Sequence, residues 1–405
     1  MLIAHLSDSH LGYRQYGLVE REKDLYSCFE EAIDRALEEH VDVIIHSGDL
    51  FHSPNPPPQA YRSALRALKK LRDRGVPFLY IMGQHDKPKT QAVAPLTVLQ
   101  DMDLLIHVSE RPYVSGDFSV IGVDYARKQV VKSKLQALKP LTKKSILVAH
   151  ILLKEVSSLG DLSINEMPRG FFYYALGDYH IFKTLKVHGA VAAYPGSSEV
   201  ISLNDLTDQG KGFCIVDISG DEARVDFQKL ENVRPRIVVE AEIDRVHEVC
   251  SKILSQASSM SLKPIIHLTV KGSGIKRKDL DRIKDELSKV SLRVFVSFEE
   301  EGLSIPSARR DDQNGDIEEI IKKSLPGMGE LLIGLYRAFR IGGLHSELER
   351  LLKTDEWIKW PEQVKASQPK VEVKTEAPKP SKPIETAKPK SSTLLGWLKY
   401  DNREA

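Results

Sequence analysis

Aspartate, histidine and glutamine side chains recur at the ends of predicted strands, where they could bind metal ions. The set comprises Asp8, His10, Asp49, His52, Gln84, His85, Asp86, His150, Asp178 and His180. In open α/β sheets the carboxyl ends of the strands converge on one rim, so residues far apart in sequence can meet in a single site. Aspartate and histidine without cysteine suit borderline divalent ions such as Mn²⁺, Fe²⁺ or Zn²⁺. The pattern therefore predicts a metal centre.

The set holds more ligands than one ion needs, which indicates a pair of ions. Two ions about 3.5–4 Å apart, bridged by a carboxylate, can activate water and stabilise the attacking and leaving oxygens of a phosphoryl displacement. Gly48, Gly83 and Gly177 each precede a member of the set and allow tight turns that direct the next side chain to the rim. Taken singly, each ligand is better explained as a structural polar residue. Taken in order, the set indicates hydrolysis of a phosphate ester.

The elements that must position these residues form an α/β pattern over residues 1–235, in which short apolar runs alternate with helical patterns. Strands are predicted at 2–6, 41–46, 77–82, 145–149, 171–176 and 190–194. Between the first two, Leu25, Phe29 and Ile33 recur at the spacing of an amphipathic helix. Five of the six predicted strands are followed closely by candidate ligands.

A second, smaller unit is predicted over residues 236–301, in the order strand, helix, strand, helix, strand. A polar linker at 302–315 then leads to a helical hairpin at 316–360, which is too short to bury both of its apolar stripes. The hairpin either packs on its own domain or binds a partner. Residues 361–390 have the composition of an extended tether, and 391–405 form a polar tail with an isolated apolar cluster.

Length and composition limit the alternatives. At about 150 residues per domain, a chain of 405 residues predicts two or three folded units. Lys and Arg number 58 and Asp and Glu 57, so the net charge of +1 provides no bulk attraction to polyanions. Cys28, Cys214 and Cys250 are scattered and odd in number, which argues against a disulfide framework. Without a membrane-spanning run or a signal-peptide pattern, we expect a soluble, cytoplasmic protein.

The ligand blocks resemble those of a known superfamily. Asp8-Ser9-His10, Gly48-Asp49, Gly83-Gln84-His85-Asp86, Ala149-His150 and Gly177-Asp178-Tyr179-His180 resemble the D-x-H, GD, GNH(D/E), H and GHxH blocks of calcineurin-like metallophosphoesterases. The segments HLSDSHLGYRQYG, GDLFH, YYALGDYH and YPGSSE are similar to the archaeal double-strand-break repair nucleases of the meiotic-recombination-eleven or SbcD type. This resemblance implies a metallophosphoesterase β-sandwich flanked by helices, a small βαβαβ capping domain that helps to hold DNA, and a C-terminal helical hairpin.

The resemblance also implies a role for each site residue. The first ion would be held by Asp8, His10, Asp49 and His180. The second would be held by Asp49, Gln84, His150 and Asp178, with Asp49 as the bridge. His85 would stabilise or protonate the leaving oxygen, Asp86 would orient His85, and His52 would contact the phosphate. Two residues depart from the family pattern, because Gln84 stands where Asn is usual and Asp178 where the first His of GHxH is usual.

The function implied is a Mn²⁺-dependent DNA exonuclease and endonuclease that processes double-strand breaks, forms a homodimer, and binds a coiled-coil ABC-type ATPase through 316–360. The tail resembles a sliding-clamp-binding box, with Leu394, Trp397 and Leu398 as its apolar residues and Ser391 where Gln is usual. Basic stretches at 132–144, 276–278 and 309–310 either contact DNA phosphates or form solvated faces. Two alternatives remain, a phosphoesterase for small esters or cyclic nucleotides and a weakly catalytic scaffold of a repair complex.

Overall fold

The computed structural model describes residues 1–88, 92–273, 277–300 and 332–333 of the chain. Two compact units are distinguished, Met1–Asn314 and Gly315–Ala405, and all the helices and strands named below belong to the first. The predicted linker 302–315, tether 361–390 and tail 391–405 lie outside the described residues. The predicted hairpin 316–360 also lies outside them, except for residues 332 and 333.

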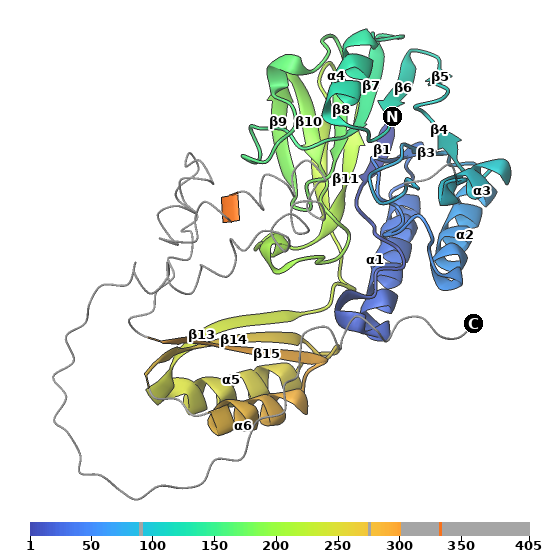
Figure 1. Ribbon diagram of the computed structural model, residues 1–405. Coiled ribbons are helices and arrows are strands. Elements are labelled where there is room, and N and C mark those ends of the chain that lie inside the picture. The colour runs from blue at the N-terminus through green and yellow to red at the C-terminus, as the bar shows by residue number, and fades with distance from the viewer. Residues whose placement is uncertain (89–91, 274–276, 301–331, 334–405) are drawn as a thin grey trace, which may run out of the picture. The chain divides into compact units, whose positions relative to one another are not determined.

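Two six-stranded sheets make up most of the first unit (Figure 1). One sheet has the order β12-β11-β1-β2-β3-β4, and the other has the order β5-β6-β7-β8-β10-β9. The strands of the first sheet are β1 (Leu2–Leu6), β2 (Val43–His46), β3 (Phe78–Tyr80), β4 (Ile106–His107), β11 (Gly212–Asp217) and β12 (Arg224–Lys229). The strands of the second are β5 (Tyr113–Ser115), β6 (Phe118–Val123), β7 (Lys144–His150), β8 (Tyr173–Gly177), β9 (Lys183–Val187) and β10 (Ala190–Tyr194).

Parallel pairing explains how one rim of the sandwich collects the polar loops. Strands β1 to β4 pair in parallel with one another, and so do β6, β7, β8 and β10, while the strands β11, β5 and β9 pair with β1, β6 and β10 in antiparallel fashion. The carboxyl ends of the central strands in each sheet therefore lie on the same side of that sheet, where the loops that follow β1, β2, β3, β7 and β8 begin.

Alternating side chains of the strands form the core. Ile3 of β1 and Ile45 of β2 pack between the sheets against Ile146 and Val148 of β7, all fully buried. The neighbouring residue Ala4 faces the opposite side, because successive side chains of a strand point to opposite faces. The predicted β-sandwich is thus confirmed.

Helices cover the outer faces of the two sheets. The outer face of the first sheet packs against α1 (Val19–Glu38), α2 (Pro58–Asp73) and α3 (Pro95–Asp101), and that of the second against α4 (Lys128–Ala137). Phe29 and Ile33, which belong to the predicted amphipathic stripe, are fully buried on α1. Burying such a side chain contributes about 1.5–3 kcal/mol, so the stripe holds α1 to the sheet. Short 3₁₀ helices lie at Gln15–Gly17, Ile164–Glu166, Leu203–Asp205 (η3) and Ile243–Arg245.

The segment predicted as a βαβαβ unit, residues 236–301, lies within the first compact unit and has the predicted order of elements. It contains β13 (Arg236–Glu242), α5 (Val246–Ser258), β14 (Ile265–Gly272), α6 (Arg277–Ser288) and β15 (Arg293–Glu300), with a parallel sheet in the order β13-β14-β15. Ile253 of α5 and Leu287 of α6 pack against Ile266 and Val294 of the sheet. Both helices therefore cover one face of this sheet. No helix within the described residues is long and apolar enough to cross a bilayer.

Candidate metal centre

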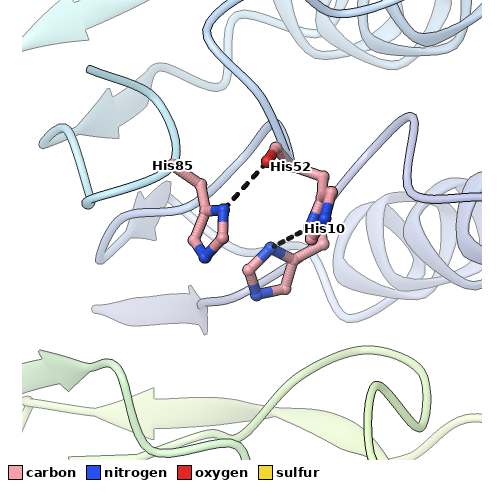
Figure 2. Close-up of side chains that lie close together, drawn as sticks. All are labelled: His10, His52 and His85. Atoms are coloured by element: carbon pink, nitrogen blue, oxygen red, sulfur yellow. Dashed lines mark hydrogen bonds between the residues drawn. The ribbon is translucent and has the colours of Figure 1, made fainter. Parts of the chain in front are cut away.

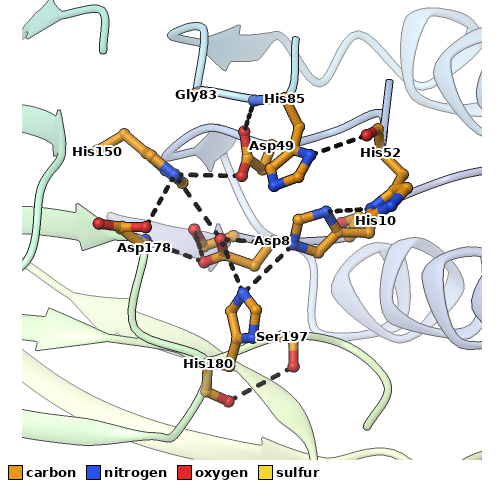
Figure 3. A network of polar contacts seen from close by, with 12 residues as sticks. Asp8, His10, Asp49, His52, Gly83, His85, His150, Asp178, His180 and Ser197 are labelled. Atoms are coloured by element: carbon orange, nitrogen blue, oxygen red, sulfur yellow. Dashed lines mark hydrogen bonds and ion pairs between the residues drawn. The ribbon is translucent and has the colours of Figure 1, made fainter. Parts of the chain in front are cut away.

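The loops that follow five strands bring the candidate ligands to one rim of the sandwich. Asp8 and His10 follow β1, Asp49 and His52 follow β2, Gln84 to Asp86 follow β3, His150 ends β7, and Asp178 and His180 follow β8. Figure 2 shows the three histidines His10, His52 and His85, which come from three of these loops. Figure 3 shows the wider cluster, in which carboxylates and imidazoles point toward one another.

Several ligand positions have a backbone conformation that non-glycine residues rarely adopt. Positive φ angles are found at Asp8 (51°), His10 (45°), Asp49 (57°) and Asp178 (86°). Each such residue costs of order 1–3 kcal/mol and persists only where the surrounding structure holds it. The conformation turns each side chain from the strand direction toward the rim.

Two glycines allow the loops to approach closely. A Cβ atom at Gly83 would lie 2.5 Å from the backbone nitrogen of Asp49 and closer still to its carboxylate. Gly48 has a φ of 102°, and a Cβ there would lie 2.7 Å from Cγ of His150. Any larger residue at either position would push a candidate ligand away, which explains the glycines that precede the ligands in the sequence.

His150 directs one nitrogen at three carboxylates. Its Nδ1 lies 2.8 Å from the carbonyl oxygen of Ser47, so this nitrogen carries the proton and donates it. Its Nε2 lies 3.4 Å from Asp49 Oδ2, 3.7 Å from Asp178 Oδ1 and 3.9 Å from Asp8 Oδ1. Burial lowers the pKa of His150, but the charges of these carboxylates outweigh burial and raise the pKa well above its ordinary value.

Two buried atoms of this group have no hydrogen-bond partner in the described part of the chain, Asp8 Oδ1 and His150 Nε2. Leaving one such atom unsatisfied costs about 1–3 kcal/mol, and more when the group is charged. A cation between Asp8, Asp49 and His150 would satisfy both atoms at once. The donor set of carboxylate oxygens and an imidazole nitrogen fits a divalent transition ion.

A second group of ligand atoms shares Asp8. Nε2 of His180 lies 3.3 Å from Nε2 of His10 and 3.7 Å from Asp8 Oδ1. The ligand atoms of Asp8, His10 and His180 lie within 4.8 Å of one another, as do those of Asp8, Asp49 and His150. Asp8 is the carboxylate common to these two groups, whereas the family resemblance implies Asp49 as the bridge between the ions. Two adjacent groups with a common carboxylate suit a pair of ions.

Asp205, which the sequence analysis missed, contacts the ring of His180 from behind. Its Oδ2 lies 3.2 Å from His180 Nδ1. Burial raises the pKa of Asp205, but the hydrogen bond and charge of His180 outweigh burial and lower the pKa to about 2. The available sequence signal was a capping box, because Ser202 and Asp205 bracket the short helix η3. That signal indicates a helix start and does not point to a metal centre.

Asp86 has different partners from those expected. Its buried carboxylate accepts hydrogen bonds from the backbone N–H groups of Asp49 (2.8 Å), Phe51 (2.9 Å) and Gly83 (3.0 Å). The ring of His85 instead places Nδ1 2.9 Å from the carbonyl oxygen of His52. The prediction that Asp86 orients the ring of His85 through a hydrogen bond is therefore wrong. Asp86 instead holds together the two ligand loops that follow β2 and β3.

The two residues that depart from the family pattern lie in different surroundings. Asp178 approaches His150 and its own backbone N–H donates to Asp8 Oδ2 at 3.2 Å. Burial raises the pKa of Asp178. Gln84 is exposed in the turn between Gly83 and His85. Of the expected second ligand set, the structure thus gathers Asp49, His150 and Asp178, while Gln84 faces solvent.

Comparisons with known proteins agree with this geometry. Residues 1–194 match the model of the calcineurin-like phosphoesterase family. The chain is 36% identical over 301 residues to the DNA double-strand break repair protein Mre11 of Sulfurisphaera tokodaii, covering 71% of this chain and 77% of that protein. The Mre11 protein of Saccharolobus solfataricus is 36% identical over 294 residues, covering 69% and 77%. The Mre11 protein of Methanocaldococcus jannaschii is 31% identical over 359 residues, covering 84% and 94%.

Proposed function

The chain belongs to the family of archaeal Mre11 DNA double-strand break repair proteins, and on this premise we propose that it is a Mn²⁺-dependent DNA phosphodiesterase that processes broken DNA ends. The observation that carries the proposal is a pair of buried atoms, Asp8 Oδ1 and His150 Nε2, which lie 3.9 Å apart and have no hydrogen-bond partner among the residues that the structure describes. Two such atoms are costly unless a cation lies between them.

Seven side chains would hold two divalent ions. Asp8, His10, Asp49 and His180 form the proposed first ligand set, and Asp49, Gln84, His150 and Asp178 the second. When bound, such a pair of ions supplies a more acidic water and stabilises negative charge on the phosphate. The protein fixes the tautomers, since Ser47 accepts from Nδ1 of His150 and Asp205 accepts from Nδ1 of His180, which leaves Nε2 of each ring free to bind.

His85 and His52 would act on the phosphate itself. The backbone N–H of His85 donates to Asp49 Oδ1 at 2.8 Å, which ties His85 to the bridging carboxylate. Since Nδ1–H of His85 donates to the carbonyl oxygen of His52, its Nε2 is the nitrogen left for a leaving oxygen, and it can deliver a proton there when the ring is protonated at both nitrogens. Burial, followed by the charge of His85, lowers the pKa of His52 to about 4, so His52 contacts the phosphate as a neutral ring.

The deciding experiment compares substrates. Mn²⁺-supported cleavage of linear duplex DNA, of single-stranded DNA and of a chromogenic phosphodiester is measured for the wild type and for Asp49→Asn. We expect both DNA forms to be cut by the wild type alone. If only the chromogenic substrate is cut, the protein is a phosphoesterase for small esters. If DNA is bound and nothing is cut, it is a scaffold, a reading that the exposed Gln84 favours.

The choice of ion follows from Asp178. An added carboxylate in the second ligand set favours a harder ion, and Mn²⁺ is harder than Zn²⁺. We expect Asp178→His to lower the affinity for Mn²⁺ relative to Zn²⁺ in competition titrations. An unchanged ratio would show that Asp178 does not bind the ion.

The segment 236–301 would bind the sugar-phosphate backbone of DNA and would not read the base sequence. Phosphate contacts predict that affinity for duplex DNA falls steeply and linearly with the logarithm of salt concentration. The basic stretch at 132–144 is less suited to this role than its charge suggests. Lys132 pairs with Glu166 at 2.7 Å, and Lys144 donates to the carbonyl oxygen of Ile218 at 2.6 Å.

Partners would bind outside the described residues. We expect a coiled-coil ABC-type ATPase to bind 316–360, so deletion of this segment should abolish its co-purification. We expect a sliding clamp to bind Leu394, Trp397 and Leu398, so Trp397→Ala should fail to retain the clamp in a pull-down. If either variant binds as the wild type does, that assignment is wrong.

A homodimer would use the exposed apolar side chains near α3. Val98 of α3 is 47% exposed, and Met102, which directly follows this helix, is 45% exposed. We expect Val98→Asp to convert a dimer to a monomer in light-scattering measurements. Leu159→Asp, at a position that is 62% exposed on a loop of the second sheet, is the matched control.

A further inference from the structure

Three histidines beside the proposed ion pair form a separate group of potential metal ligands. The ligand atoms of His10, His52 and His85 lie within 4.8 Å of one another, and Figure 2 shows that the three rings come together from separate loops. Nδ1 of His10 lies 3.3 Å from Nδ1 of His52. His10 contributes its other nitrogen, Nε2, to the proposed first ligand set.

The spacing suits zinc. In a tetrahedral site with Zn–N distances of about 2.0–2.1 Å, two nitrogen ligands lie about 3.3–3.4 Å apart. Nδ1 of His85 is occupied by the carbonyl of His52, so its Nε2 carries the free lone pair. Tyr13 stacks on His52 with a ring separation of 4.0 Å and fixes the plane of that ring. Three protein nitrogens with a fourth position open are the ligands of many zinc sites.

The donor types separate this group from the proposed ion pair. The ion pair offers carboxylate oxygens together with imidazole nitrogens, a mixture that suits Mn²⁺, whereas the three-histidine group offers nitrogen alone, which suits Zn²⁺. His10 is buried, but His52 and His85 are partly exposed, so an ion can reach the group from solvent.

His10 cannot serve both sites as a neutral ring, because a neutral imidazole has one lone pair and one N–H. If Nε2 binds the first ion, Nδ1 carries the proton and can donate it to Nδ1 of His52, 3.3 Å away. If Nδ1 binds zinc, Nε2 carries the proton and can donate it to Nε2 of His180, also 3.3 Å away. In either tautomer, the His10 nitrogen that binds no ion carries the proton and has an acceptor for it. The hydrogen bonding of His10 is therefore satisfied with either ion bound.

We propose that His10, His52 and His85 form an inhibitory Zn²⁺ site that excludes the first ion of the catalytic pair by reversing the tautomer of His10. Zinc bound there also occupies His52 and His85. Zinc binding is independent of the proposed function, and only the inhibition rests on it.

The test uses chains in which the carboxylates are removed. In an Asp8→Asn/Asp49→Asn background, we expect one equivalent of Zn²⁺ to bind, and Co²⁺ to give the intense visible absorption of a four-coordinate ion. Adding His52→Ala or, separately, His85→Ala should weaken Zn²⁺ binding by at least about 10–100-fold, since each removes a ligand. Adding His40→Ala is the control, because His40 is an exposed histidine outside the group and outside both proposed ligand sets, and it should leave Zn²⁺ binding unchanged.

The proposal is overturned if His52→Ala and His85→Ala bind Zn²⁺ as tightly as the background does, if His40→Ala weakens Zn²⁺ binding as much as His52→Ala does, or if Co²⁺ gives the weak spectrum of a six-coordinate ion. Melting curves of each variant show whether a loss of binding reflects a loss of fold, and the two histidine variants provide independent measurements. In the wild type, Zn²⁺ should then inhibit Mn²⁺-supported DNA cleavage. Absence of any cleavage with Mn²⁺ would reject the proposed function without affecting the zinc titration.

Discussion

The carboxylate of Asp205 lies 3.2 Å from Nδ1 of His180, and the opposite nitrogen of the same ring lies 3.7 Å from Asp8. The aspartate therefore holds the tautomer in which Nδ1 carries the proton and Nε2 faces the ligand cluster. A carboxylate behind a metal-binding histidine both orients the ring and makes it a stronger ligand. Asp205 thus positions a ligand of the proposed first ion. It contacts Nδ1 of His180, whereas Nε2 is the nitrogen directed at that ion.

Loss of this carboxylate should weaken metal binding. We expect Asp205→Asn to lower the affinity of the first Mn²⁺ by about 10–100-fold, because the amide supports the ring less strongly than the charge does. Calorimetric titration of Mn²⁺ measures the change. Asp208→Asn, an exposed position in the same loop, is the control and should bind as the wild type does. Equal affinities in both variants would remove Asp205 from the metal centre.

Asp86 should stabilise the fold as well as the site. Its carboxylate accepts from four backbone N–H groups that come from two loops, and it is fully buried. Asp86→Ala leaves these donors unsatisfied, so we expect the free energy of unfolding to fall by at least about 1–3 kcal/mol. Denaturant titration measures this. Asp73→Ala, whose side chain is 70% exposed, should change stability little.

The close approach of two ligand loops depends on Gly83. An alanine there would place its Cβ 2.5 Å from the backbone nitrogen of Asp49, so the loop that carries Asp49 must move. We expect Gly83→Ala to lose Mn²⁺ binding and to melt at a lower temperature. Gly220→Ala is the control, since the nearest atom to its Cβ would be 3.8 Å away. Normal metal binding by Gly83→Ala would show that the loops tolerate displacement.

Stability should decrease in mild acid because of buried histidines. Burial, followed by the charge of His46, lowers the pKa of His5 from 6.5 to about 3. The folded state therefore keeps His5 neutral, while the unfolded chain takes up a proton as the pH falls below 6.5. The stability that His5 contributes is complete above that pH and is lost as the pH falls toward about 3. For each such proton, the free energy of unfolding falls by about 1.4 kcal/mol for every pH unit in this range.

Urea titrations between these pH limits measure the slope. His5→Gln should reduce it by the contribution of one proton, whatever the stability of the variant at neutral pH. An unchanged slope in His5→Gln would mean that this ring is protonated in the folded state.

Local patterns predicted some of the elements that have a strong hydrophobic period. The strand expected at 190–194 is found at Ala190–Tyr194, and the five elements expected between 236 and 301 are all present. The strands Ile106–His107 and Tyr113–Ser115 were not predicted, because two or three residues are too few to show a period. The longer strands Phe118–Val123, Lys183–Val187 and Gly212–Asp217 were not predicted either. The half-exposed strand Arg224–Lys229 was also missed, since its side chains are mostly polar and it forms an edge of its sheet.

The sequence by itself determined which residue types could bind metal, their order along the chain and the glycines that precede them, because these are properties of short segments. The tertiary structure alone decided which atoms meet. Asp205 and His180 are separated by 25 positions, and His150 and Ser47 by 103. Hydrogen bonds of this kind depend on how the strands are ordered and paired, and side-chain periodicity within one segment contains no information about that pairing.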